Sequence, residues 1–120
     1  MVAQLSPAAR HGTGPLAGLM RDGALHCVFQ PLADLREGSV YAHEALIRGP
    51  QGGPWHAPDA LLAQARTEGV LQDFELFCVV TALEQRSAQA TPVRLFVNIS
   101  ADGLVHGVGL VATAQLGDAS

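Results

Sequence analysis

The chain has 120 residues, 48% hydrophobic and 15% charged, a globular composition that allows one domain at most and excludes an intrinsically disordered chain. Its formal net charge of −4 and pI of about 5.6 exclude the basic surface that general affinity for nucleic acid polymers or anionic lipid requires. No apolar run approaches the roughly 18 residues of a membrane span, so we expect no membrane association.

Residues 1–23 are predicted to form a polar leader interrupted by Gly and Pro, with at most a short helical turn over 15–20. They contain no apolar stretch typical of a secretory signal. Two cysteines, Cys27 and Cys78, lie in apolar segments without C-x-x-C spacing, which favours buried free thiols over a disulfide or a metal pair. These features indicate a cytoplasmic location.

Two strands are predicted next, over 24–32 and 40–48. Pro31 is expected to end the first strand, because proline cannot donate to a strand ladder. The connector between the strands, which contains Gly38, is too short for a parallel crossover. We therefore expect an antiparallel hairpin.

Two helices are predicted over 58–68 and 71–87, and a third strand over 91–100. Pro58 suits the start of the first helix and Gly69 its C-terminal cap. The order strand, strand, helix, helix, strand implies a right-handed crossover and a parallel pairing between the second and third strands. The fold class is therefore α/β, and no element is assigned to residues 101–120.

Glu44 stands in the middle of the apolar second strand, where a carboxylate is expensive unless it is paired, protonated or bound to a metal. One reading is that it pairs with Arg48 or another arginine, or points to solvent from an edge strand. Asn98 lies near the carboxyl end of the third strand, where ligands bind in α/β sheets. Two oxygen donors on neighbouring strands suit a hard cation such as Mg²⁺, although Asn98 alone is also typical of a hydrogen-bonded residue that begins a loop.

Gln30 and Arg48 complete the candidate set. Gln30 is expected at the end of the first strand as an amide that can donate and accept hydrogen bonds. Arg48 could hold a phosphate through its planar guanidinium group. Ordinary surface or turn residues are the alternative reading for both.

Three stretches together resemble an EAL domain: "FQPLADLREGSVYAHEALIRGP" (29–50), "PDALLAQARTEGVLQDFELFCVVTALEQ" (58–85) and "LFVNIS" (95–100). The family is named for the Glu-Ala-Leu found at 44–46. The resemblance implies a modified (β/α) barrel whose first strand is antiparallel to the rest. It also implies hydrolysis of the bacterial messenger cyclic di-GMP to the linear dinucleotide pGpG with Mg²⁺ or Mn²⁺.

Carried over residue by residue, the resemblance assigns five site residues. Glu44 and Asn98 would be metal ligands, Arg48 would contact the substrate phosphate, and Gln30 and Leu46 would line the nucleotide site.

The sequence departs from the family pattern after Asn98. It contains no Lys, and the only acidic residues beyond Asn98 are Asp102 and Asp118, so the family's catalytic Lys, Asp-Asp-Phe-Gly stretch and later acidic ligands are absent. A complete barrel of this kind has about 250 residues. We therefore expect 24–100 to be the N-terminal portion of an EAL domain, a partial barrel truncated after about three strands, with 101–120 as a tail.

Such a chain is expected to be inactive alone and to self-associate or bind a partner chain at its open sheet edge. Two alternatives are a non-catalytic protein-interaction module derived from an EAL domain and an α/β fragment without activity.

Overall fold

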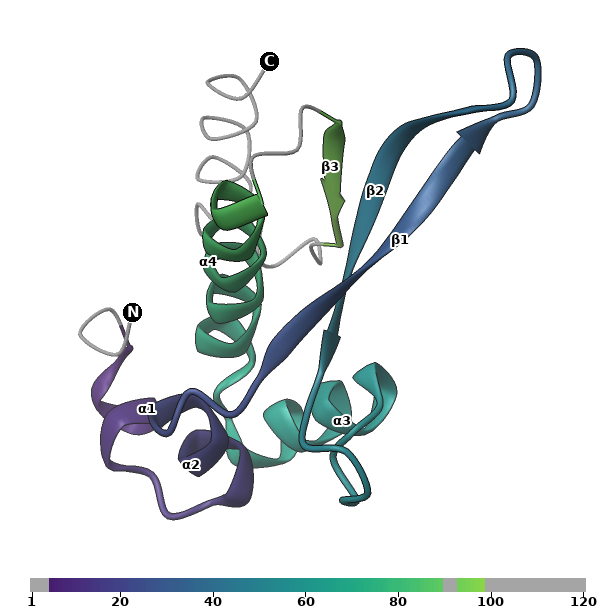
Figure 1. The fold of residues 1–120 in the computed structure, drawn as a ribbon. Helices are drawn as coiled ribbons and strands as arrows, with labels where there is room; N and C mark the ends of the chain where they lie inside the picture. Colours follow the sequence, from purple (N-terminus) through teal and green to yellow (C-terminus); the bar gives the residue numbers. More distant parts are fainter. Residues whose placement is uncertain (1–4, 90–92, 99–120) are drawn as a thin grey trace.

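A computed structural model of the chain describes residues 5–89 and 93–98, and the predicted tail lies outside these residues (Figure 1). Its elements, in chain order, are α1 (Pro7–His11), α2 (Pro15–Arg21), β1 (His26–Asp34), β2 (Ser39–Arg48), α3 (Pro58–Glu68), α4 (Leu71–Gln89) and β3 (Arg94–Val97). The predicted order of strands and helices from residue 24 onward is confirmed. The helix α1 was not predicted from the sequence.

The described strands form an open sheet in the order β1-β2-β3. β1 pairs antiparallel with β2, and β2 pairs parallel with β3, so both predicted pairings are confirmed (Figure 1). At the centre of the sheet, Glu44 is the register partner of Gln30 on one side and of Phe96 on the other. This mixed α/β arrangement is consistent with part of a barrel.

The prediction that Pro31 ends the first strand is wrong. β1 continues to Asp34, Pro31 pairs in register with His43, and the register shifts only between Leu32 and Ala33. The backbone N–H of Cys27 donates to the side-chain oxygen of Gln85 in α4, and the Gln85 amide donates to the Cys27 carbonyl. The backbone groups of Cys27 therefore point away from β2. Because this orientation repeats every second residue, the other odd-numbered residues of β1 share it. Pro31 shares this orientation, and its missing N–H removes no bond from the β1–β2 ladder.

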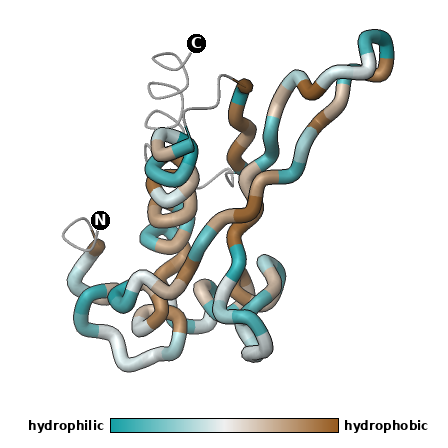
Figure 2. The backbone as a smooth tube through the Cα atoms, viewed as in Figure 1, coloured by the Kyte–Doolittle hydropathy of each residue, from teal (hydrophilic) through white to brown (hydrophobic). Residues whose placement is uncertain are grey.

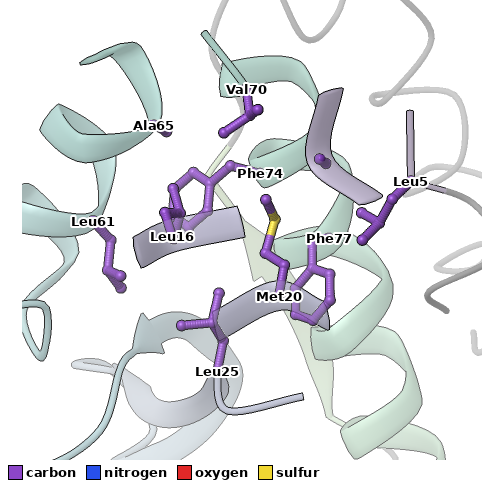
Figure 3. Packing of buried hydrophobic residues seen from close by; sticks show 10 residues of the cluster. Leu5, Leu16, Met20, Leu25, Leu61, Ala65, Val70, Phe74 and Phe77 are labelled. Atoms are coloured by element: carbon purple, nitrogen blue, oxygen red, sulfur yellow. The ribbon is translucent and has the colours of Figure 1, made fainter. Parts of the chain in front are cut away.

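The main hydrophobic core lies where the helices gather near the carboxyl end of β2 (Figure 3). Its buried residues are Leu5, Ala9, Leu16, Met20, Leu25, Leu61, Ala65, Val70, Phe74 and Phe77. Leu16, Met20 and Leu61 are fully buried. The first two helices therefore supply side chains to the core although they are short.

One face of the sheet packs on α4. Cys27, Ala45 and Leu95 of the three strands form a second buried cluster with Ala82 of the helix. In Figure 2 hydrophobic stretches of the strands lie opposite α4, whereas the turn at the far end of the β1–β2 hairpin is mostly hydrophilic. Within the described ranges, no helix is long and apolar enough to cross a membrane.

The predicted ends of α3 are confirmed. Pro58 occupies its first turn, and Gly69 ends it with a left-handed backbone (φ 71°) that non-glycine residues rarely adopt. Pro58, Leu62 and Arg66, spread along α3, line the cavity described below.

Candidate functional site

Glu44 and Asn98 lie side by side on neighbouring parallel strands. The Asn98 side-chain amide Nδ2 donates to Glu44 Oε2 at 3.1 Å. Glu44 occupies the middle of β2, and Asn98 follows directly after the last residue of β3. Glu44 is half-buried and Asn98 is exposed, so both polar groups remain reachable from outside.

The reading in which Glu44 pairs with Arg48 does not describe this structure. Arg48 Nη1 donates to the backbone carbonyl of Ile47 at 3.0 Å, and no ion pair joins Arg48 to Glu44 in the described part of the chain. The two residues are four positions apart on one strand, which is roughly 13 Å at about 3.3 Å per residue. Arg48 is therefore too far from Glu44 to bind the same metal ion. It could contact a different part of a ligand that is bound at Glu44.

Gln30 and Leu46 lie on the same face as Glu44. Gln30 is its register partner across the β1–β2 ladder, and Leu46 is two residues along β2. Gln30 was predicted at the end of its strand, but it lies in the middle of β1 because that strand continues past Pro31. The face that carries these residues is turned away from α4, and its neighbours Val28 and Phe96 are 40% and 43% exposed.

A cavity of about 330 Å³ lies on the opposite face of the sheet, between the strands and the helices α3 and α4. Its lining residues are Cys27, Ala45, Leu46, Ile47, Pro58, Leu62, Arg66, Phe74, Glu75, Cys78, Val97 and Asn98. Asn98 and Leu46 therefore belong both to the predicted site and to the cavity.

Glu75 and Arg66 are cavity residues that the sequence analysis did not single out. Glu75 is a carboxylate only 7% exposed, on the first half of α4. Its spacing from Leu71 and Cys78 places it in the apolar phase of the helix, which was the available signal. A charge in that phase needs a polar partner or a ligand.

The prediction of free thiols is confirmed for both cysteines. Burial raises the pKa of Cys27 from 9.0 to about 11. Burial also raises the pKa of Cys78 well above 9.0, and the charges of Cys27 and Glu75 raise it further. Both thiols stay protonated at neutral pH, a state that suits neither nucleophilic attack nor metal binding.

The oxygen donors at Glu44 and Asn98 fit a hard divalent cation as two of its ligands. The amide would present Oδ1 to the cation by a half-turn about its terminal torsion, which exposure of Asn98 permits. Across residues 5–89 and 93–98, no group of three or more His, Cys, Asp or Glu side chains gathers in a way that could hold a metal. Most of the coordination sphere of a bound cation would therefore come from water or a ligand.

Comparison with known proteins agrees with the resemblance of the motifs. The family model of the EAL domain matches residues 15–116, most of the chain. No curated protein matches the chain. The matched region contains Glu44 and Asn98 together with the other predicted site residues. The chain belongs to the EAL domain family, whose members act in cyclic di-GMP signalling and use divalent metals.

Proposed function

We propose that the chain binds cyclic di-GMP together with Mg²⁺ or Mn²⁺ at the face formed by Gln30, Glu44, Leu46, Arg48 and Asn98. The observation that carries the proposal is the 3.1 Å contact between Asn98 Nδ2 and Glu44 Oε2, side chains 54 positions apart in the sequence. Asn98 follows the carboxyl end of β3, the end at which ligand sites usually lie in such sheets, and it contacts Glu44 of the neighbouring strand.

Glu44 and Asn98 would hold the cation, which supplies Lewis-acid polarisation of a phosphate oxygen when bound. Arg48, the last residue of β2, would bind a phosphate through two parallel N–H groups. Leu46 lies between the two positions and offers apolar contact to the ligand, and Gln30 offers an amide across the ladder. A bacterial protein located in the cytoplasm would be consistent with this ligand.

The same proposal holds that these 120 residues bind the messenger without hydrolysing it. Two side-chain ligands leave most of an octahedral Mg²⁺ sphere to water, and a two-metal mechanism requires further carboxylates. The sequence contains no Lys and has no Glu beyond Asn98. General acid–base steps that the family assigns to such residues have no counterpart among these side chains.

The test is titration of the purified chain with cyclic di-GMP, with and without Mn²⁺, by isothermal titration calorimetry. We expect Mn²⁺-dependent binding that Glu44→Gln weakens by about tenfold or more, because the variant loses the charged oxygen while keeping its size. Glu37→Gln is the matched control, since Glu37 is exposed in the hairpin turn. Equal affinity of the wild type and Glu44→Gln would refute the proposed site.

Chromatography of the same samples tests the second half of the proposal. We expect no linear pGpG after prolonged incubation with Mn²⁺. Turnover that Glu44→Gln abolishes would show that the chain is a competent phosphodiesterase.

A second candidate is a protein-interaction module that associates through β3. Among the described residues β3 pairs on one side only, with β2, and Phe96 beside this edge is 43% exposed. Unpaired strand edges accept strands from other chains. Sedimentation equilibrium tests this candidate: a monomer at all concentrations, together with no captured partner, would exclude it.

A further inference from the structure

The border of β3 that faces away from β2 has no strand beside it in the part of the chain that the structure describes. β3 lies at the edge of the sheet and pairs there with β2 alone (Figure 1). Its outward-facing backbone N–H and C=O groups therefore have no described strand as a partner, and such groups accept a strand from another chain.

The side chains along this border differ between the two faces of the sheet. On the face that packs on α4, Leu95 is 1% exposed and Val97 is half-buried. On the Glu44 face, the side chains of β3 and of the next residue are all exposed: Arg94, Phe96 and Asn98. The Phe96 ring meets Tyr41 edge-on, with ring centroids 6.1 Å apart. The border thus combines an apolar face with a face that carries a cation, an aromatic ring and an amide.

Arg94 is complementary to the pair formed by Glu44 and Asn98. Its exposed guanidinium forms no ion pair with any residue that the structure describes. Asn98 donates through Nδ2 to Glu44, so its Oδ1 remains available as an acceptor next to a carboxylate. Within one chain, Arg94 and Asn98 lie four positions apart along the same border, about 13 Å at about 3.3 Å per residue. A second copy of the chain can bring the two groups together.

Antiparallel pairing of two β3 strands produces this contact in one register. Residues directly opposite each other then lie on the same face, with Cβ atoms about 4.5–5.5 Å apart. When Phe96 lies opposite the partner's Phe96, Arg94 lies opposite the partner's Asn98. The apolar Leu95 then lies opposite the partner's Val97. A register centred on Leu95 would instead place Arg94 opposite the partner's Phe96, away from the amide acceptor.

We propose that two copies of this chain associate through antiparallel pairing of their β3 strands, with Phe96 at the two-fold axis. In this dimer Arg94 donates to Oδ1 of the partner's Asn98, and its charge lies beside the partner's Glu44. Each copy thus contributes a guanidinium to the other copy's candidate site. The inference rests on the second candidate under the proposed function, because it names the partner and the register for the border of β3.

Exchange of the two charges tests the register. Sedimentation equilibrium is performed on the wild type, on Arg94→Glu, on Glu44→Arg and on an equimolar mixture of these two variants. We expect a concentration-dependent dimer for the wild type and a loss of dimer affinity of about tenfold or more for each variant alone, because like charges then meet at both ends of the interface. Arg36→Glu, in the exposed hairpin turn, is the matched control and should dimerise as the wild type does.

The mixture distinguishes lost contacts from lost folding. In a mixed dimer, the new carboxylate of Arg94→Glu faces the new guanidinium of Glu44→Arg at one end, and the original charges face each other at the other end. We therefore expect the mixture to regain most of the wild-type dimer affinity. A mixture that stays monomeric would contradict the proposed contact.

A disulfide cross-link measures the same register without a change of charge. Phe96→Cys places a thiol directly opposite the partner's thiol, within the Cα separation that a disulfide allows. With oxidised glutathione as oxidant, we expect a covalent dimer on a non-reducing gel. In Val97→Cys the two thiols are diagonal neighbours, about 7–8 Å apart between Cα atoms, and should cross-link much less. The wild type gives the background from Cys27 and Cys78.

The outcomes separate this inference from the proposed function. If the wild type is a monomer at all concentrations, the inference is overturned, whereas cyclic di-GMP binding is decided independently by the calorimetric titration. If the wild type dimerises but the mixture regains no affinity, or Val97→Cys cross-links as well as Phe96→Cys, the proposed register is wrong and association through β3 stands.

Discussion

Glu44 is tolerated in the central strand because its side chain is half-buried, faces away from α4 and accepts a hydrogen bond from Asn98. A carboxylate on the opposite face would lie against the apolar cluster of Cys27, Ala45 and Leu95, where burial of a charge is costly. The face of β2 on which Glu44 lies therefore decides whether its carboxylate is buried at a cost or remains accessible.

Asn98→Ala separates a structural role for the amide from a ligand role. Asn98 is exposed, so loss of its hydrogen bond should lower the free energy of unfolding by no more than about 1 kcal/mol. Urea denaturation measures this change. A loss of several kcal/mol would mean that Asn98 holds the end of β3 in place, and its proposed role in metal binding would lose its support.

Cys27 gives the stability of the chain a dependence on alkaline pH. The pKa of its thiol is about 11 in the fold against 9.0 when unperturbed, so the folded state holds this proton more tightly than the unfolded state. The resulting stabilisation is complete below pH 9 and disappears as the pH rises through 11. At about 1.4 kcal/mol per pKa unit, it amounts to about 3 kcal/mol.

Urea unfolding of the wild type and of Cys27→Ala between pH 8 and 11, with a reductant present, measures this contribution. The wild type should lose more stability than Cys27→Ala over this range. Parallel curves would contradict the burial of the thiol as the cause.

At the scale of elements, α2 depends on a side chain from α3. Glu68 accepts from the backbone N–H groups of Leu16 and Ala17, at 2.8 and 3.1 Å, at the start of α2. The preceding Gly14 has an ordinary φ of −69°, and a Cβ added there would collide with the Glu68 side chain. Gly14 therefore leaves room for the Glu68 carboxylate, and its backbone conformation does not require glycine.

Glu68→Ala and Gly14→Ala should each lower the free energy of unfolding by about 1 kcal/mol, the usual cost of a lost helix cap. Because both act on one contact, the double variant should cost clearly less than the sum of the two. Chemical denaturation of the four proteins measures the coupling, and additive costs would rule out the shared contact. Glu84→Ala on exposed α4 surface serves as control.

At the scale of the whole molecule, the N-terminal helices are part of the main core. Leu16→Ala should lower the free energy of unfolding by about 2–5 kcal/mol, because Leu16 is fully buried between helices. Leu35→Ala removes the same atoms from a side chain that is 96% exposed and should change stability by less than about 0.5 kcal/mol. Thermal melts of the two variants compare them directly, and equal effects would show that α2 does not belong to the core.

The sequence predicted those parts of the fold that local patterns determine. The short connector at Gly38 implied the hairpin, and the two helices between strands implied the parallel pairing of β2 with β3. Helix α1 has five residues, too few for a periodic pattern, and Ser6 at its N-terminus bonds to Asp73, 67 positions away. Contacts of that separation cannot be read from a local pattern.

The candidate site was predicted to the same extent. Glu44 and Asn98 were found because polar residues stand out in apolar strands, and parallel pairing of their strands brings them into contact although Asn98 lies two residues beyond Phe96, the register partner of Glu44. The cavity was missed because its wall combines α3, α4 and the sheet, and no single segment records how they approach one another. Gln30 was misplaced because an edge strand tolerates Pro31.

The amide of Gln85, bonded to both backbone groups of Cys27, has a consequence for how ligand affinity varies with concentration. Together with Pro31, which has no N–H, it reduces the donors that the outer border of β1 can offer another chain, so the proposed self-association would favour the border of β3 beside Asn98. In the proposed complex, a neighbour that docked there would stand next to the nucleotide. By mass action, ligand binding and self-association would then be coupled. The apparent dissociation constant for the ligand should therefore change when the protein is diluted.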